Sequence, residues 1–326
     1  MTRGDRVIHH TTGVLWICSM ALPSYIRLFK SGELVQRVEK AYAMLFPCRV
    51  CPRECGVDRT TGEVGYCRSG LLPVVSSYGP HFGEEPPLVG GHGSGTIFMT
   101  GCNMRCVFCQ NYEISQERYG REITCEVLAG MMIDLQNQGC HNINFVSPTH
   151  FIPQILEAVL IAAEQGLNIP LVYNTGTYDS VETLRLLDGV FDIYMPDAKY
   201  GHDEVALSLS DAPGYVGIMK KALFEMQRQV GDLVVEEGIA VRGLIIRHLV
   251  LPGNLAGSGE VFEFIAHDIS KNAYVNIMDQ YRPCGRILTD TRSPYHKTLM
   301  RGITSREYRE AVATAQKNGL IRGIYH

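Results

Sequence analysis

Residues 100–111 read TGCNMRCVFCQN and place Cys102, Cys106 and Cys109 within eight residues, at a C-x3-C-x2-C spacing. The stretch directly follows a short apolar run that is typical of a β-strand. An electron-transfer cubane of iron and sulfide takes four cysteine ligands, so three thiolates on one loop leave one iron without a protein ligand. An open coordination position indicates reaction chemistry, as it does on zinc.

Two simpler interpretations compete for this loop. A structural zinc site needs a fourth Cys or His ligand, and the next histidine, His141, lies far along the chain. Free buried cysteines are the other interpretation, but three of them on a loop bounded by glycine and polar residues are an unusual way to build a core. The spacing therefore favours an iron–sulfur cluster.

A second group of thiols lies upstream among Pro, Gly and charged residues, at a C-x2-C-x3-C-x11-C spacing, and consists of Cys48, Cys51, Cys55 and Cys67. A stretch so poor in apolar side chains cannot pack by itself, so we expect a metal to order it. Four thiolates satisfy zinc or a second iron–sulfur cluster, and both stay open. In the alternative, some of these thiols are unliganded and neighbouring contacts order the loop.

The composition is that of an ordinary globular protein. The chain has 326 residues, of which 45% are apolar and 20% charged, and its net charge is −4. This charge gives no reason to expect nucleic acid or an anionic membrane as a partner. Seven of the eleven cysteines fall in the two tight groups, which indicates metal binding in a reducing compartment, so we expect the cytoplasm.

The chain divides into three expected parts. Residues 1–20 carry Arg3 and Arg6 before a short apolar run, which loosely resembles a signal peptide, but we interpret them as a disordered or non-native leader. Residues 21–95 hold a helix at 31–46, capped by Ser31, then the four-cysteine segment and a Gly- and Pro-rich linker. Residues 96–326 form the third part and end in a helix that starts with a capping box at Thr304.

From residue 96 onward, short β runs alternate with amphipathic helices. The expected strands are 96–100, 143–147, 170–174, 191–196, 243–251 and 273–278, and no run is long enough to cross a membrane. Strands separated by helices predict a parallel sheet with right-handed crossovers. The fold class is therefore α/β, a partial (β/α)6 TIM-like barrel with an N-terminal Cys-rich metal-binding segment, and its active site should lie at the carboxyl ends of the strands.

Polar residues follow the expected strands where an active site should lie. Arg247 interrupts an apolar run, and a buried charge needs compensation, which a bound carboxylate supplies. The candidates for cofactor binding are Ser147, Thr149, Asn174, Thr175, Asp197, Lys199 and Arg247.

Other polar residues near the strand ends have simpler interpretations. Glu84 and Glu85 are most economically interpreted as solvated charges, and His248 as a packing histidine on the opposite face of its strand from Arg247. Weaker candidates for substrate contact are Gln280 and Tyr281, with Cys284 as a plain free thiol.

The string Cys102-Asn-Met-Arg-Cys106-Val-Phe-Cys109 resembles the cluster loop of the radical S-adenosylmethionine (SAM) superfamily. From residue 22 onward the chain is similar to a branch described as homologues of pyruvate formate-lyase activating enzyme, through CPRECGVDR, HFGEEPPL and GCNMRCVFCQNYEIS. The Asp-x-Lys of MPDAKY, the Asn-Thr-Gly turn and the Ile-Arg-x-x-Val-Leu-Pro-Gly-like run at Arg247 also resemble this family. At the usual Gly-Gly-Glu segment the chain departs from the family and has SPTH, with Ser147 and Thr149.

The resemblance implies a [4Fe-4S] cluster that reductively cleaves SAM to a 5′-deoxyadenosyl radical, which abstracts hydrogen from an unidentified small molecule or protein. It also implies an oxidoreductase or lyase-type enzyme and an electron donor such as ferredoxin or flavodoxin. One alternative is an activase that installs a glycyl radical in a partner enzyme. Another is a non-catalytic iron–sulfur or metal-binding electron-transfer protein. The sequence identifies no catalytic residue.

Overall fold

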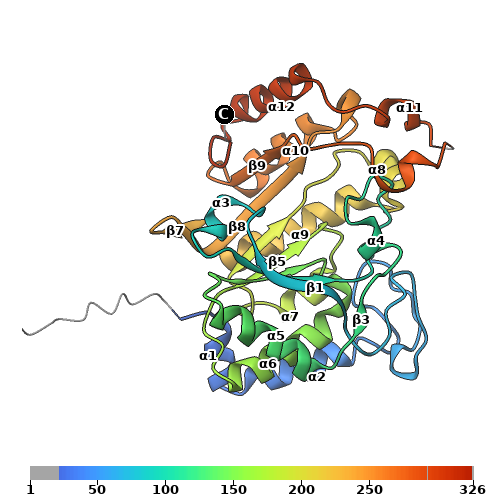
Figure 1. The fold of residues 1–326 in the computed structure, drawn as a ribbon. Helices are drawn as coiled ribbons and strands as arrows, with labels where there is room; N and C mark the ends of the chain where they lie inside the picture. The colour runs from blue at the N-terminus through green and yellow to red at the C-terminus, as the bar shows by residue number, and fades with distance from the viewer. Residues whose placement is uncertain (1–21, 292, 325–326) are drawn as a thin grey trace, which may run out of the picture.

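Six parallel strands form the centre of the protein. The computed structural model describes residues 22–291 and 293–324, so the expected leader at residues 1–20 lies outside the described residues. The parallel strands pair in chain order and are β2 (Ser94–Met99), β4 (Ile143–Val146), β5 (Leu171–Thr175), β6 (Ile193–Pro196), β8 (Ile239–Leu249) and β9 (Tyr274–Met278). Every expected strand is therefore confirmed, and with them the partial (β/α)6 barrel (Figure 1).

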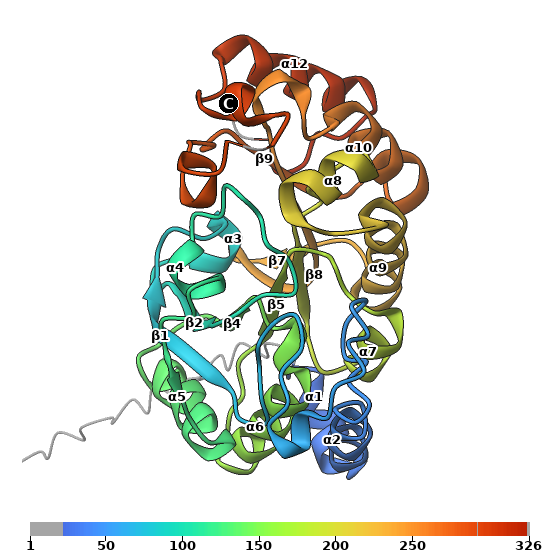
Figure 2. The same cartoon turned by 90° about the vertical axis from the view of Figure 1, so that its right-hand side faces the viewer.

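The helices between the strands lie on the outer side of the sheet (Figure 2). They are α5 (Cys125–Asn137), α6 (Ile152–Glu164), α7 (Val181–Leu186), α8 (Asp203–Ser210), α9 (Tyr215–Val230) and α10 (Ser258–Phe264), and α12 (Ser305–Lys317) closes the chain. The Thr304 capping box is present, because its side chain accepts from the Glu307 N–H while Glu307 accepts from the Thr304 N–H. Among the described residues, no helix is both long and apolar enough to cross a membrane.

The expected linker at residues 71–95 contains regular structure, so that expectation is wrong in part. Residues 74–81 form β1 (Val74–His81), which pairs antiparallel with β2, and residues 86–89 form the short helix α3 (Pro86–Val89). β1 is flanked by β3 (Arg121–Glu122), and another antiparallel strand, β7 (Val234–Glu236), borders β8. Only Val74 and Val75 of β1 are buried and the rest of the strand is half-buried or exposed, so it lacks the apolar density that identified the other strands.

The expected helix at residues 31–46 corresponds to α2 (Glu33–Tyr42), which is shorter, and a separate helix, α1 (Tyr25–Lys30), precedes it. Ser31 follows α1 instead of capping α2, and Gly32 precedes α2 with a φ of 75°. Glycine adopts this left-handed conformation without the steric cost of a Cβ, so it allows the chain to turn between the helices. The capping prediction for Ser31 is therefore wrong.

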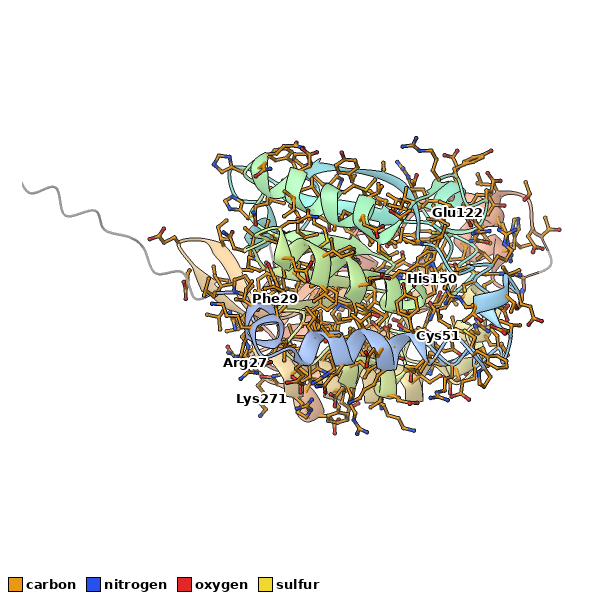
Figure 3. The ribbon with its side chains drawn as sticks, turned by 90° about the horizontal axis from the view of Figure 1, so that it is seen from below. Arg27, Phe29, Cys51, Glu122, His150 and Lys271 are labelled. Atoms are coloured by element: carbon orange, nitrogen blue, oxygen red, sulfur yellow. The ribbon has the colours of Figure 1, made fainter. Side chains whose placement is uncertain are left out.

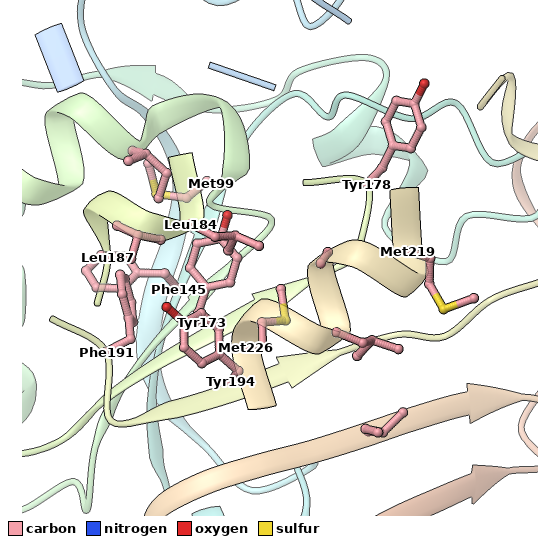
Figure 4. Packing of buried hydrophobic residues seen from close by; sticks show 14 of the residues in the cluster. Met99, Phe145, Tyr173, Tyr178, Leu184, Leu187, Phe191, Tyr194, Met219 and Met226 are labelled. Atoms are coloured by element: carbon pink, nitrogen blue, oxygen red, sulfur yellow. The ribbon is translucent and has the colours of Figure 1, made fainter. Parts of the chain in front are cut away.

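One apolar core joins the N-terminal helices to the barrel. Leu34 of α2 is fully buried and belongs to the same cluster as Phe145, Leu156 and Tyr194. Figure 4 shows part of this cluster, in which the rings of Phe145, Tyr173, Phe191 and Tyr194 pack against one another edge to face. The core thus crosses residue 95, while the division into three parts stays a prediction.

Replacing Leu34 by Ala should lower the free energy of unfolding by about 2–5 kcal/mol, because it leaves a cavity in this shared core. The neighbouring Val35 is 44% exposed, so Val35→Ala should change stability by at most about 0.5 kcal/mol. Urea unfolding of the two variants measures the difference. Equal effects would show that α2 is not part of the barrel core.

Candidate active site

The three-cysteine loop follows the carboxyl end of β2, as expected for a barrel whose site lies at the strand ends. Gly101 opens the loop with a φ of 77°, and a Cβ at this position would lie 2.9 Å from the carbonyl oxygen of Cys67. Both the conformation and the close approach therefore require glycine. This contact brings the four-cysteine segment against the base of the loop.

Each thiol of the loop has a hydrogen-bonding neighbour. The Ser210 hydroxyl donates to Cys106 Sγ over 2.9 Å, Cys109 Sγ lies 3.2 Å from Ser115 Oγ, and the Met104 N–H donates to Cys102 Sγ over 3.4 Å. Such bonds orient the ligands of a metal site and tune it.

Electrostatics links the three thiols to one another and to a lysine. Burial, with a smaller contribution from Cys106, raises the pKa of Cys102 to about 12 and that of Cys109 to about 11, and Lys199 opposes both shifts. Metal binding needs deprotonated thiols, so it must displace these protons. Three mutually interacting thiols with hydrogen-bonding neighbours and a nearby cation are a donor set that fits a cubane with one open iron. In the described part of the chain, no three His, Cys, Asp or Glu side chains are arranged to hold a single metal ion.

Four of the candidate residues meet in one ion network at the ends of β5, β6 and β8. Arg247 donates to Asp197 Oδ1 through Nε over 2.7 Å and to Asn174 Oδ1 through a terminal nitrogen over 2.8 Å. Lys199 Nζ lies 2.6 Å from Asp197 Oδ2. Asp197 and Arg247 are bridged between adjacent strands, which explains why residues so distant in sequence meet.

The charged groups of this network stabilise one another's ionised forms. Burial raises the pKa of Asp197, but Arg247 and Lys199 overcome this effect and hold it below its usual value. Burial lowers the pKa of Lys199, and Asp197 with Cys106 more than reverses the shift. Asp197 and Glu84 already compensate the charge of Arg247, so the inference that a bound carboxylate must do so is not supported.

Glu84 and Glu85 belong to this region, and the expectation that they are solvated is wrong. The Glu84 side chain is 8% exposed and its Oε2 lies 3.6 Å from Arg247, while Glu85 accepts a 2.6 Å hydrogen bond from Asn276 Nδ2. Burial raises the pKa of Glu85, although Arg247 and Asn276 oppose the shift. The turn after β1 therefore adds two buried carboxylates to the mouth of the barrel.

The two threonine candidates face a buried carboxylate instead. Thr149 and Thr175 each donate a 2.7 Å hydrogen bond to Asp179, and Tyr173 donates a third over 2.8 Å. Ser147 has a φ of 57°, and its N–H donates to the Asn174 carbonyl over 2.9 Å. These contacts hold the ends of β4 and β5 together.

The remaining candidates take structural positions. His248 is buried, with Nδ1 2.6 Å from the Ala198 carbonyl and Nε2 2.9 Å from Ser258 Oγ, which agrees with a packing role. The Tyr281 hydroxyl donates to the Leu299 carbonyl over 2.7 Å, and Cys284 donates to the Phe108 carbonyl over 3.1 Å. Gln280 is exposed.

The four thiols of the N-terminal segment gather around Cys51. Burial, with smaller contributions from Cys67, Cys55 and Cys48, raises the pKa of Cys51 to about 12. Gly65 lies so close that a Cβ would stand 2.7 Å from Cys55 Sγ. Figure 3 places Cys51 near the carboxyl end of α2.

An arginine fastens this segment to the cluster loop. Arg53 Nε donates to the Asn103 carbonyl over 2.9 Å, and its guanidinium lies 3.7 Å from the centre of the Tyr66 ring. The Tyr66 hydroxyl donates to Asp211 Oδ2 over 2.7 Å. The sequence contains no local signal for this docking, because its partners are distant along the chain.

Comparisons with known proteins agree with this geometry. The radical SAM superfamily profile matches residues 96–265. The uncharacterized protein MJ0674 of Methanocaldococcus jannaschii is 33% identical over 304 residues, which cover 89% of this chain and 80% of that protein. This chain therefore belongs to the radical SAM superfamily, and membership implies an enzyme of radical chemistry that uses a [4Fe-4S] cluster and SAM.

Two solved structures are also similar. One is anSMEcpe with bound AdoMet, at 13% identity and a TM-score of 0.44, and the other is HydG, a maturase of the [FeFe]-hydrogenase, at 11% identity and a TM-score of 0.46. The matches cover 72% and 70% of this chain, and 56% and 50% of those structures.

The buried His248 should make stability depend on pH. Burial lowers the pKa of His248 to about 4, whereas this imidazole in the unfolded chain has a pKa near 6.5. Between pH 4 and pH 6.5 the unfolded chain therefore binds a proton that the folded chain does not. Stability from this group is complete above pH 6.5 and is lost as the pH falls towards 4. Over that range the wild type should lose about 3 kcal/mol more than His248→Gln in urea unfolding.

The exposed His267 provides the matched control, and His267→Gln should keep the wild-type dependence on pH. If His248→Gln and the wild type lost stability in parallel, the imidazole would not be held neutral by burial.

Proposed function

We propose that this protein is a radical SAM enzyme that cleaves SAM reductively and uses the 5′-deoxyadenosyl radical to abstract hydrogen from a substrate. The three-cysteine loop at the end of β2, with Lys199 acting on its thiols, is the observation that carries the proposal. The cluster supplies the electron that breaks the S–C5′ bond of SAM, with methionine as the other product.

The chain's own residues hold and orient the reacting groups. Cys102, Cys106 and Cys109 would ligate three irons, while Ser210 and Ser115 fix two of the sulfur atoms. Orientation and exclusion of water are the protein's share of such a reaction. The buried strand ends around the loop can both orient a bound substrate and exclude water.

Asn174, Asp197, Lys199 and Arg247 are our proposed contacts for the amino acid part of SAM. They offer both a carboxylate and cations at one place, which suits a ligand that carries an ammonium and a carboxylate group. Their mutual hydrogen bonds hold them in position before SAM binds. Thr149 and Thr175 support the site through Asp179, and Ser147 supports it through its bond to Asn174.

Anaerobic reconstitution with iron and sulfide, followed by dithionite and SAM, should yield 5′-deoxyadenosine, measured by chromatography. Cys106→Ala should abolish this product, because it removes one ligand of the cluster. Cys140 is buried and belongs to neither thiol group, so Cys140→Ala should retain the product.

Product formation equal in Cys106→Ala and the wild type would contradict the proposed cluster ligands. A cluster in the wild type that is unchanged by SAM and forms no 5′-deoxyadenosine would favour the electron-transfer alternative.

We also propose a metal or iron–sulfur cluster on Cys48, Cys51, Cys55 and Cys67. The electrostatic coupling of Cys51 to the other three thiols supports a shared four-thiolate site. Among the described residues the thiols are not arranged around a single ion, so zinc would have to draw them closer together, and zinc and a second cluster both take four thiolates. Such a site would stabilise a segment that has few apolar side chains of its own.

Elemental analysis of the reconstituted chain tests this second site. Cys51→Ser should lose one zinc, or the iron and sulfide of one cluster, per chain and should keep the metal bound by the three-cysteine loop. Cys140→Ala again serves as the control and should match the wild type. Wild-type metal content in Cys51→Ser would refute the four-thiolate site.

A further inference from the structure

A cavity of about 220 Å³ lies between the four-cysteine segment and the cluster loop. Cys67 and Arg68 line it from the segment, Cys102 and Arg105 from the loop, and Arg286 from the short helix η5 (Gly285–Leu288). Helix α4 (Tyr112–Ser115) contributes to another wall. Only one thiol of each group borders the cavity, so it is centred on neither metal site.

The lining of this cavity is cationic. Three arginines contribute to it, and none of its lining residues is Asp or Glu. Within the described residues, Arg68, Arg105 and Arg286 form no ion pair, and the buried Nε of Arg286 has no hydrogen-bond partner. Guanidinium groups are well suited to binding carboxylates, so the lining is ready for an anionic group.

Two of the arginines have fixed positions. The Arg105 guanidinium lies 4.3 Å from the centre of the Tyr66 ring, and Arg68 donates to the Gln116 carbonyl. Gln116 in turn donates to the Cys106 carbonyl over 2.9 Å. The cavity wall is therefore continuous with the cluster loop.

The cavity and the proposed SAM contacts are two separate regions beside the cluster loop. None of the four proposed SAM contacts lines the cavity: Asn174, Asp197, Lys199 and Arg247. Cys102 borders the cavity, and the charge of Lys199 opposes the rise that burial causes in the pKa of its thiol. Cys102 thus connects the two regions. The cavity therefore offers an electron carrier an approach beside a cluster ligand that does not pass through the proposed SAM contacts.

We propose that this cavity is the docking point of an acidic electron-carrier protein, and the inference rests on the proposed function. A carboxylate side chain of the carrier enters among Arg68, Arg105 and Arg286, and the carrier's redox centre comes to rest near Cys102. The reduced carrier loses one electron and the cluster gains it. The cavity volume suits a side chain and not the carrier's own cofactor.

Charge complementarity selects this partner. The whole chain has a net charge of −4, so it has no general attraction for an acidic protein, whereas the cavity lining holds three arginines and no carboxylate. Complementary charges chiefly raise the association rate and fix orientation, and this effect weakens with salt. Docking at the cavity should therefore be fast at low ionic strength and slow at high ionic strength.

Arg68→Gln and Arg286→Gln in the reconstituted full chain test the docking. Reduced flavodoxin is the probe, and stopped-flow absorbance follows the bleaching of the cluster. Each variant should slow this reduction about tenfold, which corresponds to the loss of one charged contact of about 1.4 kcal/mol, and should flatten its dependence on salt. With dithionite, both variants should form 5′-deoxyadenosine at the wild-type rate.

Arg306 on α12 provides the matched control, because its side chain is 80% exposed and lies outside the cavity lining. Arg306→Gln should be reduced by flavodoxin at the wild-type rate. Wild-type reduction rates in Arg68→Gln and Arg286→Gln would overturn the docking site, whether or not dithionite supports SAM cleavage. Absence of 5′-deoxyadenosine with dithionite would refute the proposed function alone, because flavodoxin-driven bleaching and calorimetric binding of flavodoxin still decide the docking.

Inorganic phosphate distinguishes a small anion from a carrier protein. If phosphate bound the wild type, lost its affinity in Arg286→Gln and left flavodoxin-driven reduction unchanged, the cavity would be a small-anion site and the proposal would be overturned. If phosphate slowed flavodoxin-driven reduction competitively, the cavity would be confirmed as the place that the carrier's carboxylate occupies.

Discussion

A largely buried guanidinium at the carboxyl ends of the parallel strands constrains the mouth of this barrel. Arg247 cannot remain charged there without compensation, so three neighbours from different elements turn towards it: Asp197, Asn174 and Glu84. Each contact fixes the end of a strand or of the turn after β1. The position of Lys199, and through it the field around the cluster cysteines, follows from the same arrangement.

Much of this organisation can be predicted from local patterns. The six parallel strands have short apolar runs bounded by polar residues, and the three-cysteine loop has a spacing that few other sites share. Asp197, Lys199 and Arg247 can be identified because they interrupt or directly follow such runs. The carboxyl ends of parallel strands meet at one edge, so their meeting follows from the topology.

The wrong predictions from the sequence have a common physical cause. Partners that are distant along the chain decide whether these residues are buried and which secondary structure they adopt. Glu84 and Glu85 look solvated beside their sequence neighbours, but Arg247 and Asn276 bury them. β1 lacks a dense apolar pattern, and its pairing with the distant β2 and β3 makes it a strand. Ser31 is a good capping residue, but Gly32 places the start of α2 one residue later.

The contact between Gly101 and the Cys67 carbonyl has a consequence for assembly. Residues 48–67 leave the ribosome before residue 101, so the surface that supports the base of the cluster loop is synthesised earlier than the loop itself. The position of the Cys67 carbonyl therefore limits how the base of the cluster loop can pack, although the two segments are far apart along the chain.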